Sequence, residues 1–427
     1  MLRDHCVPDG FLRDTSGVRS FGEAQVGKVD WEPHCLAPLA RHLGSRGEEA
    51  LRGVSRREIL AAWDGAIAEL RDRRSARRQA LEPALASLCR LSPAGLAAGL
   101  DVVLAGADGE AAAALAARLQ PAPERGLALV VLASNVPGLA VQPLLRLLLE
   151  QRPLLLKSSS AEPLFAPALV EALVERLPAL ADAVAAMTWP GSDQQLNAEA
   201  CRAAGEVIAY GGDAAIAELH SLTQKPFLAL GPKASVAVVG GDAEIVATAH
   251  AIARDIALFD QRGCLSVQAV YTSGDAAGLA NALAAALRER AHEWPAGPIL
   301  PEEAAAVQQA RAEADLRACF RPDLELAQGT VILDPDPRFR PGPGLRTVRI
   351  HPLPDLSDLP ALLEPWAGRL QGIAEAGTIP AGLRARLGEL GVTRFAPAGE
   401  LQHADATWEN WGEALGAAAG PTSASAG

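Results

Sequence analysis

From Leu127 onward, apolar residues follow two patterns that alternate along the chain. Short apolar runs, such as LALVVLAS (127–134) and SVQAVYTSGD (266–275), are typical of buried strands. They are separated by stretches with apolar residues at helical spacing, such as APALVEALVERL (166–177). Strands that alternate with helical stretches of about 10–15 residues indicate βαβ units and a parallel sheet. The pattern therefore predicts an α/β fold.

The two ends of the chain have different patterns. Residues 1–45 are rich in turn formers, so we expect them to be irregular. Residues 47–118 carry Leu and Ala at helical spacing and predict several helices. The tail, GPTSASAG (420–427), is small and polar, and we expect it to be disordered.

Length and composition restrict the class of protein. With 427 residues, the chain is long enough for two domains or more. Its content of 49% hydrophobic and 21% charged residues is typical of a soluble globular protein, and the few aromatic residues favour helix-rich α/β architecture. The net charge of −12 would repel nucleic acid, so we expect no nucleic-acid partner.

The six cysteines are scattered, and they form neither a CxxC pair nor a His/Cys cluster at metal-ligand spacing. We therefore expect reduced thiols, no metal site and a cytoplasmic protein. The first residues, MLRDHCVPDGFLRD, lack the apolar core of a signal peptide. The most apolar stretch, residues 127–150, is interrupted by polar residues and prolines, so no transmembrane segment is predicted.

Several short segments carry residues suited to chemistry, but each is ambiguous when taken alone. A free cysteine such as Cys264 is most often a small buried residue, and Asn135 and the GGD at 211–213 are typical of turns. The segments occur in a fixed order along the chain: ASNVPG (133–138), KSSSAEP (157–163), VIAYGGD (207–213), LALGPKASVAVV (228–239) and FDQRGCLSVQ (259–268).

In this order, the segments resemble the aldehyde dehydrogenase superfamily and, within it, the fatty acyl-CoA reductase family of the bacterial bioluminescence type. The resemblance covers Ala133 to Asp275 and resumes at residues 362–374 and 391–402, while the first 125 residues match only loosely. It implies two Rossmann-like, doubly wound domains of the aldehyde dehydrogenase type. We divide the chain accordingly into an N-terminal helical segment with the cofactor-binding domain (1–232), a catalytic domain (233–400) and a C-terminal segment (401–427).

The resemblance also implies roles for two residues in the chemical step. Cys264 occupies the position of the nucleophile, whose thiolate attacks a thioester carbonyl and expels the thiol, leaving an acyl-enzyme. Asn135 occupies the position of the family's asparagine, whose amide helps the backbone N–H of the nucleophile to bind the oxyanion. Each such donor is worth about 3–4 kcal/mol in the transition state.

Five residues are implied in cofactor binding. Lys157 matches the family's cofactor-binding lysine, and Gly211 and Gly212 would let the backbone approach the pyrophosphate at a helix N-terminus. Where relatives carry a carboxylate that binds the adenosine ribose, this chain has Ser160, and Ser158 also precedes it. Hydroxyl groups beside a lysine accept a 2′-phosphate, so we expect NADPH rather than NADH, with NADH as the alternative.

One departure from the superfamily pattern concerns the fate of the acyl-enzyme. Aldehyde-oxidising members have a glutamate at the position of Ala229, where it activates water, and alanine cannot do so. No residue can be assigned to the glutamate that anchors the nicotinamide ribose in the superfamily. The departure at Ala229 favours reduction of an activated acyl group over oxidation to a free acid.

The sequence therefore predicts an acyl-CoA reductase that converts an acyl thioester to the aldehyde, with acyl-CoA or an acyl-protein thioester as substrate. A homo-oligomer is expected. Three alternatives stay open at this point: a reductase of acyl phosphates or another acylating aldehyde dehydrogenase, an acyltransferase or acyl carrier without hydride transfer, and a non-catalytic scaffold.

Overall fold

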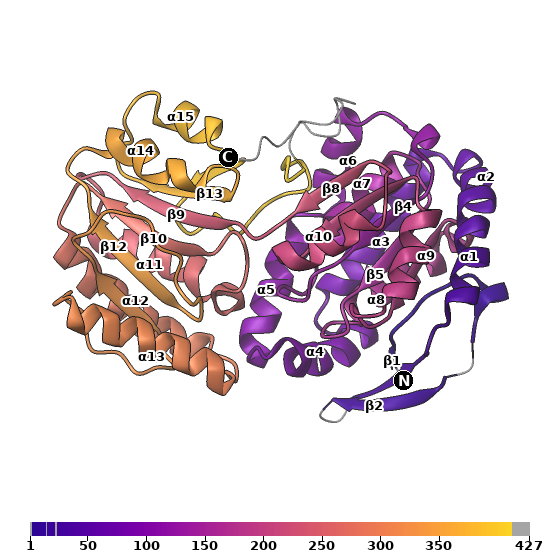
Figure 1. Ribbon diagram of the computed structural model, residues 1–427, viewed down its shortest axis with the longest axis horizontal. Coiled ribbons are helices and arrows are strands. Elements are labelled where there is room, and N and C mark those ends of the chain that lie inside the picture. The colour runs from indigo at the N-terminus through magenta and orange to yellow at the C-terminus, as the bar shows by residue number, and fades with distance from the viewer. Residues whose placement is uncertain (1, 14, 22–23, 412–427) are drawn as a thin grey trace.

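The structure is a computed structural model that describes residues 2–13, 15–21 and 24–411. It contains two parallel sheets, which form two lobes side by side (Figure 1). We call residues 2–230 the first lobe and residues 234–397 the second lobe. The predicted α/β class is confirmed.

The sheet of the first lobe has five parallel strands in the order β6-β5-β4-β7-β8. From the central strand β4 the chain first builds one side of the sheet and then returns to build the other, so the switch point lies between β4 and β7. The bounds are β4 (Ala128–Val131), β5 (Leu154–Ser158), β6 (Val184–Thr188), β7 (Glu206–Tyr210) and β8 (Phe227–Leu230).

Helices cover both faces of this sheet, because alternate residues of each strand point to opposite sides and both sets are apolar. In β4, Val130 belongs to the apolar core of one face and Leu129 to that of the other. The covering helices are α3 (Arg56–Arg71), α5 (Pro93–Ala105), α7 (Val141–Leu149) and α8 (Phe165–Arg176) on one face, and α1 (Pro33–His42), α9 (Gln194–Ala203) and α10 (Asp213–Ser221) on the other.

The sheet of the second lobe has six parallel strands in the order β11-β12-β10-β9-β13-β14. Its strands are β9 (Ala234–Val239), β10 (Val267–Thr272), β11 (Thr330–Leu333), β12 (Thr347–Pro352), β13 (Leu370–Ala376) and β14 (Arg394–Pro397). One face packs against α11 (Ile245–Ala257) and α12 (Ala276–Glu293), and the other against α14 (Leu359–Leu363) and α15 (Leu383–Glu389), while α13 (Pro301–Leu316) lies beside β11.

The N-terminal region differs from its prediction. Residues 1–45 were expected to be irregular, but their described part contains a three-stranded sheet and α1. The turn formers mark connections between short elements, and Pro33 starts α1 at a position where its missing N–H is not needed. The strands are β1 (Leu2–Arg3), β2 (Gly17–Phe21) and β3 (Ala24–Lys28).

The helices predicted within residues 47–118 are confirmed. Besides α3 and α5, they are α2 (Glu48–Arg52), α4 (Ala76–Cys89) and α6 (Gly109–Arg118). Within the described part of the chain, no single helix is long and apolar enough to cross a membrane; α4 and α5, bent by 111°, meet that length and composition criterion only as a pair.

After β14 the chain returns to the first lobe, as the yellow ribbon shows (Figure 1). The Ala406 N–H donates to the Gly106 carbonyl at 2.7 Å, and the Trp411 indole N–H donates to the Tyr210 hydroxyl at 2.8 Å. The segment therefore joins the two lobes beside the end of β7. The tail that was predicted to be disordered, residues 420–427, lies outside the described residues.

Candidate active site

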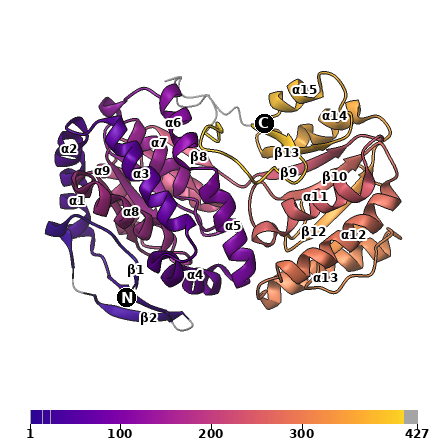
Figure 2. The ribbon, with the colours of Figure 1, turned by 180° about the vertical axis from the view of Figure 1, so that it is seen from behind.

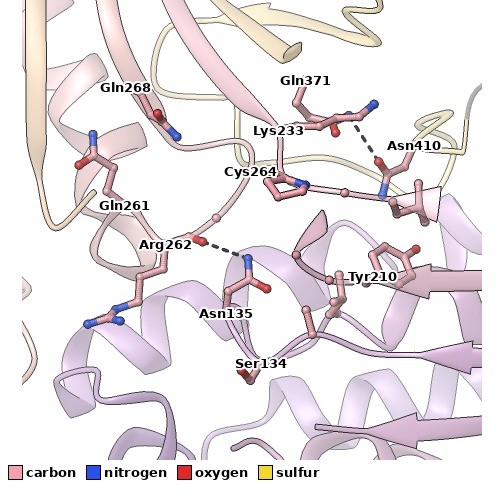
Figure 3. Close-up of a pocket in the computed structure, with 18 residues that line it drawn as sticks. Ser134, Asn135, Tyr210, Lys233, Gln261, Arg262, Cys264, Gln268, Gln371 and Asn410 are labelled. Atoms are coloured by element: carbon pink, nitrogen blue, oxygen red, sulfur yellow. Dashed lines mark hydrogen bonds between the residues drawn. The ribbon is translucent and has the colours of Figure 1, made fainter. Parts of the chain in front are cut away.

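A pocket of about 350 Å³ lies between the two lobes. The first lobe contributes the loops at the carboxyl ends of β4, β7 and β8, which include Asn135, Gly211 and Gly212. The second lobe contributes the loop before β10, with Cys264 (Figure 3). The pocket thus opens at the switch point of the first sheet, where doubly wound sheets bind their ligands.

Cys264 is half-buried in a turn between a short 3-10 helix, Leu258–Gln261, and β10. The Ser235 hydroxyl of β9 donates to the Cys264 carbonyl at 2.8 Å, which fixes the backbone of the turn against the sheet. We call residues 258–266, which include the predicted nucleophile Cys264, the nucleophile loop.

The nucleophile loop holds three consecutive residues in the left-handed region. The φ angles are 53° at Phe259, 49° at Asp260 and 62° at Gln261. For residues other than glycine, each such conformation costs about 1–3 kcal/mol and persists only where the surroundings enforce it. The contacts described next hold these three residues in this conformation.

The side chain of Gln261 ties the loop to two strands. Its amide nitrogen donates to the carbonyls of Val267 at 2.6 Å and Thr347 at 2.9 Å, and its amide oxygen accepts from the Thr347 N–H at 2.7 Å. Three hydrogen bonds from one buried side chain therefore fix the start of β10 relative to β12.

Two further contacts hold the residues before Gln261. Asp260 is paired with Arg346 at 2.6 Å and accepts from the Gly297 N–H at 2.9 Å. Phe259 is buried against α5 of the first lobe, and an added Cβ at Gly99 would lie only 2.3 Å from its ring. Figure 2 shows α5 on the side of the first lobe that faces the second. The nucleophile loop is therefore clamped between both lobes.

Asn135 connects the first lobe directly to the nucleophile loop. Its side-chain amide donates to the carbonyl of Arg262 at 3.0 Å (Figure 3). A primary amide has two N–H donors, so one remains for another acceptor. Asn135 can hold the loop and present a donor beside Cys264 at the same time.

The electrostatics around the thiol come from burial and from one cation. Burial raises the pKa of Cys264, while the charge of Lys233 and the N–H groups of Cys264 and Leu265 act in the opposite direction. Burial also lowers the pKa of Lys233. None of the described residues that line the pocket is an aspartate, glutamate or histidine. The lining has two cations, Lys233 and Arg262, and Lys233 is the one whose charge acts to lower the pKa of Cys264.

Ala229 lies in β8 with its side chain exposed, and the pocket is lined by its neighbour Leu230. No carboxylate replaces the missing one, because the described lining contains none. The described lining therefore offers neither a carboxylate nor a histidine as a base for a water molecule at Cys264.

On the cofactor side, Gly211 and Gly212 lie at the N-terminus of α10, with Gly212 as its N-cap residue. The first N–H groups of a helix have no partner within the helix and attract anions. Tyr210 precedes them, and Trp411 holds its hydroxyl. Free N–H groups at this edge are of a kind that fits a pyrophosphate.

Lys157, Ser158 and Ser160 do not line the pocket but lie at and just after the carboxyl end of β5, next to β4. Burial lowers the pKa of Lys157 to about 8, and its ammonium lies 5.8 Å from the centre of the Trp189 ring. The Ser158 hydroxyl is buried without a hydrogen-bond partner among the described residues, whereas exposed Ser160 donates to the Trp189 carbonyl at 3.2 Å. The Lys157 ammonium and the unpartnered Ser158 hydroxyl are of a kind that fits the ribose end of a dinucleotide at the same sheet edge.

Sequence reasoning missed several residues of the site. Lys233 stands four positions after Ala229 in a segment already singled out, and Arg262 stands two before Cys264. Gln268, Gln371 and Asn410 also line the pocket. Sequence carries no signal for Asn410, because it reaches the pocket only through the return of the C-terminal segment to the first lobe.

Comparison with solved structures identifies the class of fold. The chain has the fold of aldehyde dehydrogenases: it superimposes on the NADP-dependent glyceraldehyde-3-phosphate dehydrogenase of Bacillus halodurans in complex with NADP with a TM-score of 0.71 and 14% identity, over 93% of this chain and 91% of that one. The NAD-dependent benzaldehyde dehydrogenase of Corynebacterium glutamicum gives a TM-score of 0.70 and 13% identity, over 93% and 95% of the two chains.

The family follows from the sequence match. Residues 113–413 match the acyl-CoA reductase (LuxC) family, and the chain belongs to it. The long-chain acyl-protein thioester reductase of Aliivibrio fischeri is 30% identical over 241 residues, which are 55% of this chain and 50% of that protein. The long-chain acyl-protein thioester reductase 2 of Photobacterium leiognathi is 35% identical over 35% of this chain and 33% of its own. The matches thus span half or less of these curated relatives.

Proposed function

We propose that the protein reduces a long-chain acyl thioester to the aldehyde, using a reduced nicotinamide cofactor and a covalent acyl group on Cys264. The observation that carries the proposal is the position of Cys264: it faces Asn135 and the glycine turn after β7 across one pocket, at the switch point of a doubly wound sheet. Membership of the acyl-CoA reductase family and the activity in the relatives' names support the same reaction.

The reaction divides into two steps at one sulfur atom. The Cys264 thiolate attacks the carbonyl carbon of the thioester, a new carbon–sulfur bond forms, and the bond to the carrier breaks. The carrier leaves as a thiolate and takes up the proton that Cys264 released. When bound, the reduced nicotinamide supplies the hydride for the Cys264 thioester and is itself oxidised. The resulting thiohemiacetal oxyanion expels the Cys264 thiolate and leaves the aldehyde.

Three features of the chain promote these steps. The free N–H of Asn135 stabilises the negative charge on the carbonyl oxygen, which develops in both steps. The Lys233 charge favours the thiolate over the thiol against the effect of burial. The clamped nucleophile loop fixes the sulfur, so little freedom is lost on reaching the transition state.

The same pocket disfavours hydrolysis of the acyl-enzyme. Water needs a base to attack a thioester at a useful rate, and no carboxylate or histidine is present among the described lining residues. The acyl group therefore persists until it is reduced. This argues against a dehydrogenase that releases free acid.

NADPH is the proposed cofactor. Ser160 is exposed beside Lys157 at the end of β5, where a carboxylate would repel a 2′-phosphate. The Ser158 hydroxyl, which has no partner among the described residues, and the Lys157 ammonium supply donors for that phosphate.

The proposal is tested by trapping the acyl group. Protein incubated with radiolabelled tetradecanoyl-CoA and no cofactor should gain a label that neutral hydroxylamine releases. Adding NADPH should discharge it as tetradecanal, one aldehyde per NADPH oxidised. Cys264→Ala should take up no label, while Cys319→Ala, which removes another half-buried thiol, should behave as wild type.

Two results would reject the proposal. Labelling of Cys264→Ala at the wild-type level would show that another residue carries the acyl group. A labelled wild type that yields no aldehyde with NADPH or NADH would identify an acyltransferase instead.

A further inference from the structure

Gln371 and Asn410 line the Cys264 pocket, and no step described above uses them. Gln371 belongs to β13 of the second sheet, and Asn410 belongs to the C-terminal segment that returns to the first lobe. A few well-placed polar groups on the wall of a pocket fix the orientation of a ligand and select it. Two side-chain amides beside the nucleophile are therefore candidates for recognition of the substrate.

A β-bulge places Gln371 at the pocket. β13 pairs with β9 through Leu370 and Gly372, which lie opposite consecutive residues of β9, so Gln371 between them has no partner residue. A bulge of this kind bends the strand and re-aims a side chain. β10 has the same irregularity at Gln268, which also lines the pocket. Each strand beside β9 thus contributes one unpaired glutamine to the pocket.

The bulge in β13 lies against the backbone of the nucleophile. The Ser235 hydroxyl of β9, which donates to the Cys264 carbonyl at 2.8 Å, faces this part of β13. An added Cβ at Gly372, next to Gln371, would lie 3.1 Å from that hydroxyl oxygen and 3.2 Å from the side chain of Leu265. β13 therefore packs closely on the residues that anchor the nucleophile, and Gln371 extends from this position.

Hydrogen bonds fix the orientation of the Gln371 amide. Its Nε2 donates to the Thr393 hydroxyl at 2.8 Å and to Oδ1 of Asn410 at 3.4 Å, and Figure 3 shows the second bond. Both N–H donors of this amide are thus used, while its Oε1 has no hydrogen-bond partner among the described residues. Gln371 is only 2% exposed, and a buried acceptor without a donor is costly. The pocket that Gln371 lines is the place where a ligand can supply that donor.

The groups proposed for the cofactor lie elsewhere. All of them belong to the first lobe, at the ends of β5 and β7. A second cavity, of about 490 Å³, meets the Cys264 pocket at Arg262 and extends to Ala161 in the loop after β5. Gln371 does not line this cavity, and in Figure 3 Arg262 and Asn410 lie on different sides of the nucleophile. The acceptor of Gln371 is therefore available to the thioester.

We propose that Oε1 of Gln371 accepts a hydrogen bond from an amide N–H of the thioester's carrier, with Asn410 as the residue that positions Gln371. The inference rests on the proposed function. In CoA, and in the phosphopantetheine group of carrier proteins, the first polar hydrogen beyond the sulfur is an amide N–H, two methylene groups away. The acyl chain has no such donor. Gln371 thus selects pantetheine-type thioesters over thioesters whose carrier has no amide at this place.

The test compares two tetradecanoyl thioesters that differ in one group. The thioester of N-acetylcysteamine has the amide N–H, and the thioester of 2-mercaptoethyl acetate has an ester oxygen in its place. The readout is the ratio of kcat/KM for the amide to that for the ester, with NADPH as cofactor. Wild type should favour the amide about tenfold or more, because the ester leaves Oε1 of Gln371 without a donor. Gln371→Met, which preserves the size of the side chain, should bring the ratio to about one.

Two further variants make the test specific. Gln308→Met, at an exposed position of α13, should keep the wild-type ratio. Asn410→Ala removes one of the two bonds that orient Gln371 and should lower the ratio by a smaller factor, about threefold. An equal fall in kcat/KM for both thioesters in Gln371→Met, with the ratio unchanged, would overturn the proposal, because Gln371 would then only support the pocket.

An effect on the cofactor in place of the thioester would also overturn it. The reduced 3-acetylpyridine analogue of NADPH has a methyl ketone where NADPH has its carboxamide, so it lacks the N–H donors of that group. Loss of the preference for NADPH over this analogue in Gln371→Met, with the ratio of the thioesters unchanged, would show that Gln371 binds the nicotinamide.

Binding to an inactive variant keeps this inference separate from the proposed function. If wild type reduces neither thioester with NADPH or NADH, the proposed function fails. The two thioesters are then titrated calorimetrically into Cys264→Ala, which cannot take up the acyl group. The amide should bind about tenfold more tightly than the ester, and adding Gln371→Met should remove the difference. Equal binding of the two thioesters to Cys264→Ala would reject the site.

Discussion

The two sides of the Cys264 pocket are built in opposite ways. On the second-lobe side, the nucleophile loop holds three successive left-handed residues and is tied down by hydrogen bonds, an ion pair and a buried aromatic ring. On the first-lobe side, the turn after β7 is made of Gly211 and Gly212, and an added Cβ at Gly212 would meet nothing within 4 Å. We call the side with the nucleophile loop the fixed side, and the side with the Gly211–Gly212 turn the open side.

The proposed function accounts for this difference. A nucleophile has to hold its sulfur in one geometry through two covalent steps, and stored strain is tolerable where the surroundings enforce it. A cofactor must enter and leave in every turnover, so free backbone donors without bulky side chains suit its side. Changes on the fixed side should therefore cost more than changes on the open side.

Asn135 should give the largest effect, because it joins the two sides. Asn135→Ala removes the donor to the oxyanion and the hydrogen bond to the Arg262 carbonyl. We expect the rate of acyl transfer to Cys264, measured by CoA release in a single turnover, to fall about 10²–10³-fold. Asn281→Ala, on the exposed face of α12, is the control and should not change it.

A second substitution separates the two functions of Asn135. Asn135→Asp preserves size but has no N–H to donate when ionised. It should be as slow as Asn135→Ala. A wild-type rate for Asn135→Asp would show that the donor is not needed.

Gly99→Ala tests the clamp on the nucleophile loop. The added Cβ would lie 2.3 Å from the Phe259 ring, so the ring must shift. Overpacking of this kind costs about 1–3 kcal/mol in the free energy of unfolding and outweighs the better helix propensity of alanine. Denaturant unfolding should show the loss, and kcat should fall with it.

Gly388 supplies the matched control for that variant. It lies in α15, and an added Cβ would meet nothing within 4 Å. Gly388→Ala should be as stable as wild type or up to about 1 kcal/mol more stable. Equal stability and kcat in Gly99→Ala and wild type would mean that Phe259 does not hold the loop.

Local sequence pattern predicted most strands of both sheets, but not the contacts that hold the nucleophile loop. Periodicity predicted the strands β4 to β7 and β9 to β12, because each is a continuous apolar run bounded by turn residues. It also predicted the helices α7, α8, α10, α11 and α12, but not α9 or α13. It missed β8, β13 and β14, which are short or contain Gly, Glu, Arg and Pro. These strands form through pairing with neighbours distant in sequence, which local pattern does not encode.

The same limit applies to the site. Order of segments and family resemblance predicted that Cys264, Asn135, Gly211 and Gly212 belong together, and they line one pocket. Nothing local indicates that Phe259 packs on Gly99, or that Gln261 binds the backbone of Thr347. Such contacts join residues far apart in the chain, so only the three-dimensional structure reveals the clamp.

Lys233→Met tests the electrostatics of the fixed side. Burial raises the pKa of Cys264 and the Lys233 charge opposes it, so loss of that charge should raise the pKa further. A higher pKa lowers the thiolate fraction at any pH below it. Alkylation by iodoacetamide at pH 8 should therefore be slower in Lys233→Met than in wild type, and the difference should vanish well above the pKa.

The pH profile distinguishes this effect from damage to the pocket. A blocked or distorted site would slow alkylation equally at every pH. Lys225→Met, which removes an exposed lysine, should follow the wild-type profile. Identical profiles for Lys233→Met and wild type would exclude Lys233 as the group that favours the thiolate.

The smallest effect is expected on the open side, at Ser160. Ser160→Glu places a carboxylate where it can bind ribose hydroxyls and repel a 2′-phosphate, so the ratio of kcat/KM for NADPH to that for NADH should fall. Because Ser160 is exposed, solvent and salt screen the new charge, and we expect a change of about tenfold or less that shrinks as ionic strength rises. Ser45→Glu adds the same charge at an exposed position on the π-helical turn after α1 and should leave the ratio unchanged.

A wild-type enzyme that prefers NADH would reject the assignment of Ser160. A change much larger than tenfold would instead show that this end of the cofactor site is enclosed, and the contrast between a fixed side and an open side would then fail.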